Sequence, residues 1–347
     1  RFLMKGKLIL ENGKVFEGKI FGELADSVGE ISFNTGMTGY QEMLTDPAGH
    51  GMMMVMTYPM IGNYGINTED MESDKVQLKA LIIKEDAKLP NNFRCEMTLD
   101  GFLRQYNVTG FKGIDTRYLT QIIRDNGSMK AIITAEDLTK KEIQERFNSF
   151  SNKNAVSEVS CKEKYEIKGE GKRIGVLDLG VKKSTLAYLE SQGFNVVVFP
   201  YNTKAEEILN ENLSALVVSN GPGNPADLTE TIEELKKVIG KISVFGEVLG
   251  HQVIALALGG KVAKLKYGHR GGYPVRDMAA GKIITTSQNA GYVVVELPEG
   301  MEMTHQGVNV KTIEGMKNDD LKVVGVQFMP DLYESPKDVF VNFLKLV

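Results

Sequence analysis

Short apolar runs alternate with helical periodicity through the second half of the chain. The apolar runs, which we interpret as buried strands, are 173–178, 195–200, 215–219, 241–245 and 323–328. Segments with helical spacing lie between them, at 182–192, 203–210, 229–239 and 253–258. The region between 260 and 322 reads as an antiparallel insertion before the closing strand. This alternation predicts an α/β fold with a doubly wound, mostly parallel sheet, whose functional sites lie at the carboxyl ends of the strands.

The first half of the chain has shorter runs and more turns. Apolar runs at 7–10, 15–18 and 30–33 are separated by turn signals such as Asn12-Gly13, which predicts a β-rich N-terminal domain. Two helices are expected, over 116–124 and 139–147. The apolar face of the first would carry Leu119, Ile122 and Ile123.

A polar segment separates these two patterns. Residues 151–170 are rich in Ser, Lys and Glu without a clear period, and we interpret them as an interdomain linker with some strand content. The predicted organisation is therefore a β-rich domain over 1–150, a linker over 151–170 and an α/β domain over 171–347.

A glycine-flanked turn stands between the strand at 241–245 and the helix at 253–258. Its sequence is Gly246-Glu247-Val248-Leu249-Gly250-His251-Gln252. Strand, sharp turn and helix form the geometry of a nucleophile elbow, in which one side chain is lifted above the sheet beside a helix N-terminus. The exposed position of this turn should be Val248, and a valine has no nucleophilic atom.

Composition excludes several classes of function. The 347 residues are 42% hydrophobic and 25% charged with a net charge of −4, as in ordinary soluble proteins, and no block of like charges suggests nucleic acid or a membrane surface. The two cysteines, Cys95 and Cys161, give neither a disulfide framework nor metal-ligand spacing, so we expect a reducing cytoplasm and no metal. No phosphate-binding glycine loop is present, so the chain itself is not expected to bind ATP.

The turn at 246–252 resembles the Gly-Ile-Cys-Leu-Gly-His-Gln motif of class I glutamine amidotransferases. Three strings in the first half, at 33–47, 58–65 and 113–129, resemble signatures of one branch, the carbamoyl phosphate synthetase small-subunit family. The resemblance covers nearly the whole chain. Amidotransferases of other pathways, such as anthranilate or guanine nucleotide synthesis, lack this N-terminal domain, which disfavours them.

The resemblance implies a fold, a partner and a reaction. In this family the small subunit hydrolyses glutamine and passes ammonia to a large ATP-dependent synthetase subunit. That partner makes carbamoyl phosphate from ammonia, bicarbonate and ATP for arginine and pyrimidine synthesis. ATP is therefore expected only on the large subunit, and no cofactor is expected on this chain. L-glutamine is the implied ligand.

Several positions match the binding part of the family site. The resemblance assigns the oxyanion-binding backbone amides to Gly221 and Leu249. It assigns contacts with the substrate glutamine to Gly223, Gln252, Asn289, Gly291 and Tyr292. Ala48 occupies the position of a serine that hydrogen-bonds the substrate in the family.

The reactive positions depart from the family. Val248 stands at the nucleophile position, Met329 at the histidine position and Asp331 at that of the orienting glutamate, while Ala290 replaces a further histidine. Thiolate attack with histidine as base needs groups that these side chains do not offer.

No other residue takes their place in the sequence. His269 and His305 do not follow the last strand, as the base should, and Glu247 should point away from the tip of the turn. The sequence therefore predicts that glutaminase activity is lost. The alternative is a non-catalytic scaffold that supports synthesis from ammonia alone.

Overall fold

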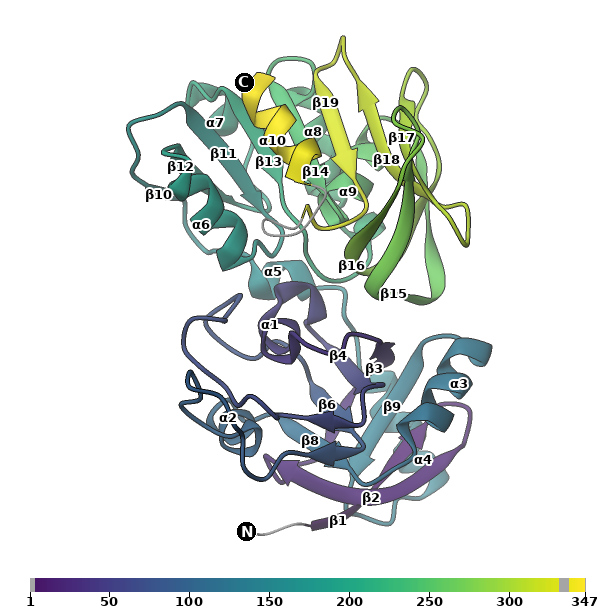
Figure 1. Cartoon of the computed structure of the whole chain (residues 1–347). Coiled ribbons are helices and arrows are strands. Elements are labelled where there is room, and N and C mark those ends of the chain that lie inside the picture. The colour runs from purple at the N-terminus through teal and green to yellow at the C-terminus, as the bar shows by residue number, and fades with distance from the viewer. Residues whose placement is uncertain (1–3, 331–336, 347) are drawn as a thin grey trace. The chain divides into compact units, whose positions relative to one another are not determined.

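The structure is a computed structural model that describes residues 4–330 and 337–346, and the chain divides into two compact units (Figure 1). The N-terminal unit runs to Asn152 and also contains Lys266–Arg270 from the second half of the sequence. The C-terminal unit consists of Lys153–Leu265 and the chain from Gly271 onward. Each unit is described by itself.

The N-terminal unit is built on a closed seven-stranded barrel in the order β1-β2-β8-β6-β4-β3-β9. Its strands are β1 (Met4–Leu10), β2 (Val15–Gly22), β3 (Ser27–Asn34), β4 (Met52–Met56), β6 (Ala80–Ile83), β8 (Thr109–Lys112) and β9 (Met129–Thr134). A two-stranded sheet, β5 (Met60–Ile61) with β7 (Glu85–Asp86), accompanies the barrel. The predicted β-rich start is confirmed, whereas the parallel pairs β3–β4, β4–β6 and β6–β8 were not anticipated.

Strand β4 shows why this barrel needs an uninterrupted apolar run. All five of its residues, Met52-Met53-Met54-Val55-Met56, are buried. Met53 and Val55 pack in one apolar cluster, and Met52, Met54 and Met56 pack in another. Successive side chains of a strand point to opposite faces, so a strand covered on both faces reads as continuous hydrophobic sequence.

Four helices complete the N-terminal unit: α1 (Tyr40–Thr45), α2 (Leu99–Gln105), α3 (Thr116–Asn126) and α4 (Lys140–Ser149), with a 3₁₀ turn, η1 (Pro47–Gly49). The expected apolar face of α3 is confirmed, because Leu119, Ile122 and Ile123 are all buried. Helix α4 starts where Thr139 and Glu142 form a reciprocal capping box, which satisfies two backbone N–H groups.

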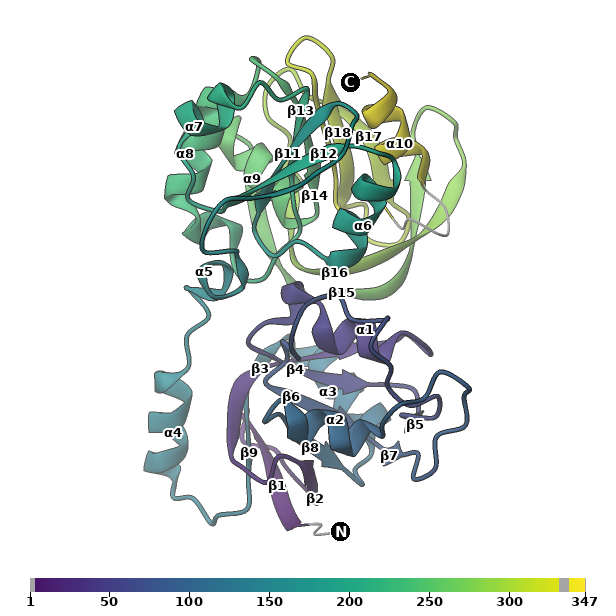
Figure 2. The ribbon, with the colours of Figure 1, turned by 90° about the vertical axis from the view of Figure 1, so that its left-hand side faces the viewer.

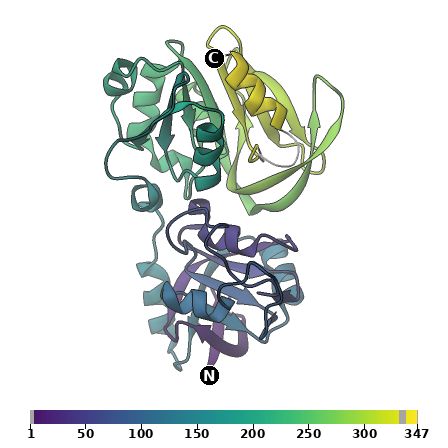
Figure 3. The same ribbon diagram turned by 60° about the vertical axis from the view of Figure 1, so that its left-hand side comes forward.

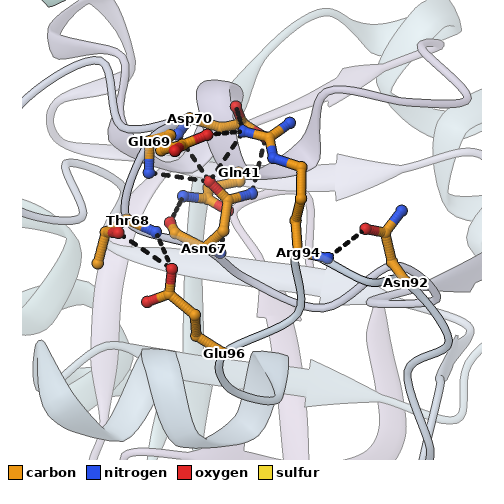
Figure 4. A network of polar contacts seen from close by, with 8 residues as sticks. All are labelled: Gln41, Asn67, Thr68, Glu69, Asp70, Asn92, Arg94 and Glu96. Atoms are coloured by element: carbon orange, nitrogen blue, oxygen red, sulfur yellow. Dashed lines mark hydrogen bonds and ion pairs between the residues drawn. The ribbon is translucent and has the colours of Figure 1, made fainter.

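A polar network holds α1 against the loops around Asn67 (Figure 4). The fully buried Gln41 accepts a 3.0 Å hydrogen bond from the Asn67 backbone N–H and donates to the Asn67 carbonyl oxygen. Arg94 donates to Asp70 at 2.6 Å and to Glu69 at 2.9 Å. These contacts connect helix α1 with the loop segment around Asn67 and connect that segment with Arg94.

The C-terminal unit is organised around a ten-stranded sheet in the order β10-β12-β11-β13-β14-β19-β18-β16-β15-β17 (Figures 1 and 3). Its strands are β10 (Tyr165–Ile167), β11 (Arg173–Asp178), β12 (Asn195–Pro200), β13 (Ala215–Val218), β14 (Ser243–Glu247), β15 (Lys261–Asp277), β16 (Ile283–Glu296), β17 (Glu302–Gly307), β18 (Ile313–Asn318) and β19 (Val323–Val326). Strands β12, β11, β13, β14 and β19 are parallel, and β15 to β18 form the expected antiparallel part.

Helices cover both faces of the parallel part of the sheet (Figure 2). They are α6 (Lys183–Ser191), α7 (Ala205–Asn210), α8 (Thr229–Val238), α9 (Leu249–Ala257) and α10 (Lys337–Leu346), with a 3₁₀ turn, η2 (Pro225–Asp227). Helices α7, α8 and α9 share one apolar cluster, and α6 and α10 share the other. The doubly wound α/β fold is therefore confirmed.

The segment 151–170 carries regular structure. It contains helix α5 (Ala155–Val159) and strand β10, which pairs antiparallel with β12 at the edge of the sheet. Among the described residues, no helix has both the length and the apolar character to cross a membrane.

Candidate functional site

The predicted elbow is present between β14 and α9. Val248 has φ 48° and ψ −98°, a left-handed conformation that a β-branched residue adopts only under strain, on the order of 1–3 kcal/mol. Its N–H donates to the Val326 carbonyl oxygen at 2.8 Å, so the turn is fixed to the neighbouring strand β19. Helix α9 starts at Leu249, four residues earlier than expected. The expected exposure of Val248 is wrong: only 1% of it is exposed, because the apolar side chain is enclosed in the protein.

Glycines allow the backbone to pack closely around this turn. A Cβ atom on Gly250 would lie 2.0 Å from the carbonyl oxygen of Val218, and one on Gly246 would lie 2.8 Å from the backbone nitrogen of His251. Neither approach tolerates a side chain. The glycines at these two positions are therefore required by the fold of the elbow, independently of any chemistry at Val248.

The loop that carries Gly221 packs against the side chain of Leu249. A Cβ atom on Gly221 would be 2.9 Å from Cδ2 of Leu249, which places the loop after β13 against the first residue of α9. The Gly221 N–H donates to Oδ1 of Asn220 at 2.7 Å. Leu249 is the first residue of the helix, where backbone N–H groups have no partner within the helix. Gly223 follows in the same loop with φ 87°.

Met329 lies beyond the end of β19, at the same edge of the sheet as Val248. Strands β14 and β19 are parallel neighbours with Glu247 opposite Val326, so the residues after both strands emerge together. The Met329 N–H donates to the Ser287 carbonyl oxygen at 2.9 Å, and the Lys182 ammonium lies 3.7 Å from its sulfur. A thioether is a weak acceptor and cannot serve as a general base.

Gln252 meets β16 and the segment after β19 in a closed set of hydrogen bonds. Its Nε2 donates to the Tyr292 carbonyl oxygen at 2.8 Å and to Oε1 of Gln327 at 3.2 Å. Nε2 of Gln327 donates to the same Tyr292 oxygen at 3.1 Å. Gln252 and Tyr292 were predicted as site residues. Gln327 was missed, although a glutamine two residues before Met329, directly after a buried strand, was a usable signal.

Asn289 and Gly291 lie on β16, and both are partly buried. The adjacent Gln288 donates to the buried Glu314 at 2.8 Å, and burial raises the pKa of the Glu314 carboxyl group. This contact fixes β16 to β18 next to the predicted glutamine contacts. The glutamine-binding roles of these residues remain predictions.

Among the other titratable candidates, Cys161 is unsuited to nucleophilic attack. Burial, followed by the nearby Asp178 carboxylate, raises the pKa of the Cys161 thiol to about 12, so it stays protonated. His251 is completely buried, neither ring nitrogen has a hydrogen-bond partner among the described residues, and burial lowers its pKa to about 3. It is therefore a neutral residue of the elbow.

Ala48 and Asp331 are the remaining predicted site residues. Ala48 lies in the 3₁₀ turn η1 of the N-terminal unit, where its N–H donates to Oδ1 of Asp46 at 2.9 Å. Asp331 lies outside the described residues.

Comparison with protein families gives two matches along the chain. The family described as carbamoyl-phosphate synthase small chain, CPSase domain, matches residues 8–133. The family described as glutamine amidotransferase class-I matches residues 175–347.

Individual relatives match over nearly their full length. The carbamoyl phosphate synthase small chain of Clostridium perfringens (strain 13 / Type A) is 51% identical over 346 residues, which cover 99% of each chain. The pyrimidine-specific small chain of Bacillus subtilis (strain 168) is 45% identical over 350 residues, 99% of this chain and 96% of that one. The small chain of Streptococcus mutans is also 45% identical, over 99% of this chain and 97% of its own. The chain therefore belongs to the carbamoyl phosphate synthase small-chain family and contains a class I glutamine amidotransferase domain.

Proposed function

We propose that this chain is a carbamoyl phosphate synthase small subunit that binds a large ATP-dependent subunit and L-glutamine but does not hydrolyse glutamine. The observation that carries the proposal is Val248 at the elbow, with φ 48° and ψ −98°. The backbone holds a side chain where a nucleophile would stand, but the side chain is a hydrocarbon. Met329, at the proposed base position, offers a thioether.

The chemistry of amide hydrolysis supports this proposal. It needs a nucleophile, and a base that takes the proton of that nucleophile and delivers it to the leaving ammonia. Removing triad residues from a hydrolase typically lowers turnover by roughly 10⁴- to 10⁶-fold. Backbone amides alone polarise the carbonyl group but supply no attacking atom. ATP would bind only to the large subunit, and this chain would use no metal.

The same observation favours a second role, that of a non-catalytic scaffold. In this role the chain supports carbamoyl phosphate synthesis from free ammonia, for arginine or pyrimidine formation, without delivering ammonia itself. The chain would keep the fold of its family and its binding to the large subunit, and it would lack the glutamine reaction.

The test is an assay of the purified chain with the large subunit from the same organism. We expect the two chains to co-purify, carbamoyl phosphate to form from ammonium chloride, and no glutamate to be released from glutamine. The large subunit alone is the control, and shows what the small chain adds to ammonia-dependent synthesis. Synthesis from glutamine at a rate comparable to that from ammonia would overturn the proposal.

A further inference from the structure

The hydrogen bonds around Gln252 leave only one orientation for its side-chain amide. The Tyr292 carbonyl oxygen can only accept, so the nitrogen of Gln252 must face it at 2.8 Å. The second hydrogen of that nitrogen goes to Oε1 of Gln327 at 3.2 Å. Both hydrogens of the amide are used, and the oxygen must point the other way.

Gln327 is fixed by the same logic. Its Nε2 donates to the Tyr292 oxygen at 3.1 Å, which turns its own Oε1 toward Gln252. Gln252 is 2% exposed and Gln327 is 1% exposed, so water does not compete for these bonds. Gln327 and the Tyr292 carbonyl oxygen thus hold the same nitrogen of Gln252, and they are hydrogen-bonded to each other.

The oxygen of Gln252 is left as an acceptor. None of the described residues donates a hydrogen bond to this oxygen. The oxygen is also not one of the buried polar atoms that lack a partner, so it remains accessible to solvent. Gln252 lies four residues after Val248 on α9, about 6 Å along the helix axis from the elbow. The α-ammonium group of glutamine is separated from its amide carbon by three carbon–carbon bonds and one carbon–nitrogen bond, a length that suits this separation.

We propose that Gln327 is a positioning residue, which fixes the Gln252 amide so that its oxygen accepts from the α-ammonium group of a bound amino acid. The ligand part of this inference rests on the proposed glutamine binding. The orientation of Gln252 does not, and the two parts are tested separately.

The first test uses the full chain without ligand. Nuclear magnetic resonance of ¹⁵N-labelled protein gives the solvent-exchange rate of the Gln252 side-chain amide protons, in the wild type and in Gln327→Met. We expect the variant to exchange at least roughly tenfold faster, because one of two anchoring hydrogen bonds is lost. The Gln41 side chain, held by Asn67, is the internal control and should not change. An unchanged Gln252 rate would overturn the positioning role.

The second test measures binding by calorimetry, with L-glutamine and with glutaramate, which lacks the α-ammonium group. Gln327→Met should weaken glutamine binding by roughly tenfold and change glutaramate binding less than about twofold. If Gln327 acts through Gln252, the Gln252→Met, Gln327→Met double variant should bind glutamine no more weakly than Gln252→Met alone. Additive losses, or equal losses for both ligands, would contradict the proposal.

Two further outcomes are distinguishable. If the wild type binds no glutamine while the exchange test gives the expected result, the proposed glutamine binding fails and the positioning of Gln252 stands. If Gln327→Met does not fold, Gln327→Leu replaces it in both tests. That variant also removes the acceptor for Gln252 and the donor to Tyr292, and it should show the same acceleration of exchange.

Discussion

The N–H of Val248 donates to the carbonyl oxygen of Val326 at 2.8 Å, which fixes the elbow to the strand that leads to Met329. The two positions that the family resemblance assigns to nucleophile and base are therefore positioned by one pair of parallel strands. Replacing both side chains should leave this backbone arrangement in place.

Restoring the reactive groups should restore glutamine hydrolysis. We expect Val248→Cys combined with Met329→His to release glutamate from glutamine, at a rate at least roughly 100-fold above the unmodified chain, because the lost triad accounts for a larger factor. Each single variant is the control and should remain near background, since nucleophile and base act as a unit. A double variant that binds glutamine but releases no glutamate would show that the assigned positions are wrong.

Ala48→Ser should strengthen glutamine binding in the unmodified chain. The family resemblance assigns position 48 to a serine that hydrogen-bonds the substrate, and one such bond would be worth about 0.5–1.5 kcal/mol, or roughly a two- to tenfold lower dissociation constant. Calorimetry with L-glutamine measures the change. Ala280→Ser, on an exposed turn, is the matched control and should not alter binding. Equal affinities for the Ala48→Ser and Ala280→Ser variants would argue against the role assigned to position 48.

Gly250→Ala should destabilise the C-terminal unit. Its added methyl group would lie 2.0 Å from the Val218 carbonyl oxygen, and relieving such overlap costs typically about 1–3 kcal/mol. Gly272→Ala is the control, because its nearest neighbour would be 3.6 Å away. Thermal unfolding should show a melting temperature lowered by several degrees for Gly250→Ala only. Similar melting temperatures would mean that the end of β13 moves away from the helix at little cost.

His251 should make the protein less stable in acid. Burial holds its pKa at about 3, below the usual 6.5, so the unfolded chain binds a proton there before the folded chain does. The free energy of unfolding is therefore unaffected by protonation of His251 above pH 6.5, and it decreases progressively as the pH falls from 6.5 toward 3. The slope approaches about 1.4 kcal/mol per pH unit.

The measurement is urea unfolding of the wild type and His251→Asn at pH 7 and pH 5. The asparagine does not titrate, so the variant should lose less stability between the two pH values than the wild type. Parallel losses in the two proteins would contradict the effect of burial on His251.

Gln41→Leu should destabilise the N-terminal unit by leaving the backbone N–H and carbonyl groups of Asn67 without their side-chain partner. Each buried polar group left in this way costs about 1–3 kcal/mol. Gln144→Leu, on the exposed side of α4, is the control, with an expected change within about 0.5 kcal/mol. Chemical unfolding monitored by circular dichroism measures the free energy of unfolding of both variants. Equal stabilities would mean that water replaces the Gln41 side chain.

The elements that the sequence predicted well are those with a strong local period. Strand β11 at Arg173–Asp178 and strand β12 at Asn195–Pro200 match the expected ranges, because each is an apolar run bounded by polar turns. The early start of α9 was missed because Gly250 and His251 are weak helix formers and Val248 makes no side-chain cap. There the close approach to β13 determines the conformation, which local sequence does not reveal.

Pairing between strands that are distant along the chain could not be predicted from the sequence. Closure of the barrel depends on β1 pairing with both β2 and β9, and no local signal specifies the second partner. Helix α10 had a usable signal that was not used, since Phe340, Phe343 and Leu344 repeat at helical spacing and are buried. Within the site, the nature of the side chain at each position could be read from the sequence. The hydrogen bonds that join Gln252 to Gln327 required coordinates.

The assignment of Lys266–Arg270 to the N-terminal unit has a consequence for how this gene can be divided. Tyr267 stacks on Phe33, and Arg270 donates to the Ser32 hydroxyl at 2.8 Å. A fragment that stops at residue 152 would therefore leave β3 without these partners. Recombination at a single breakpoint between the two halves of the gene would separate residues that fold together. We therefore expect the two halves of the gene to be inherited together.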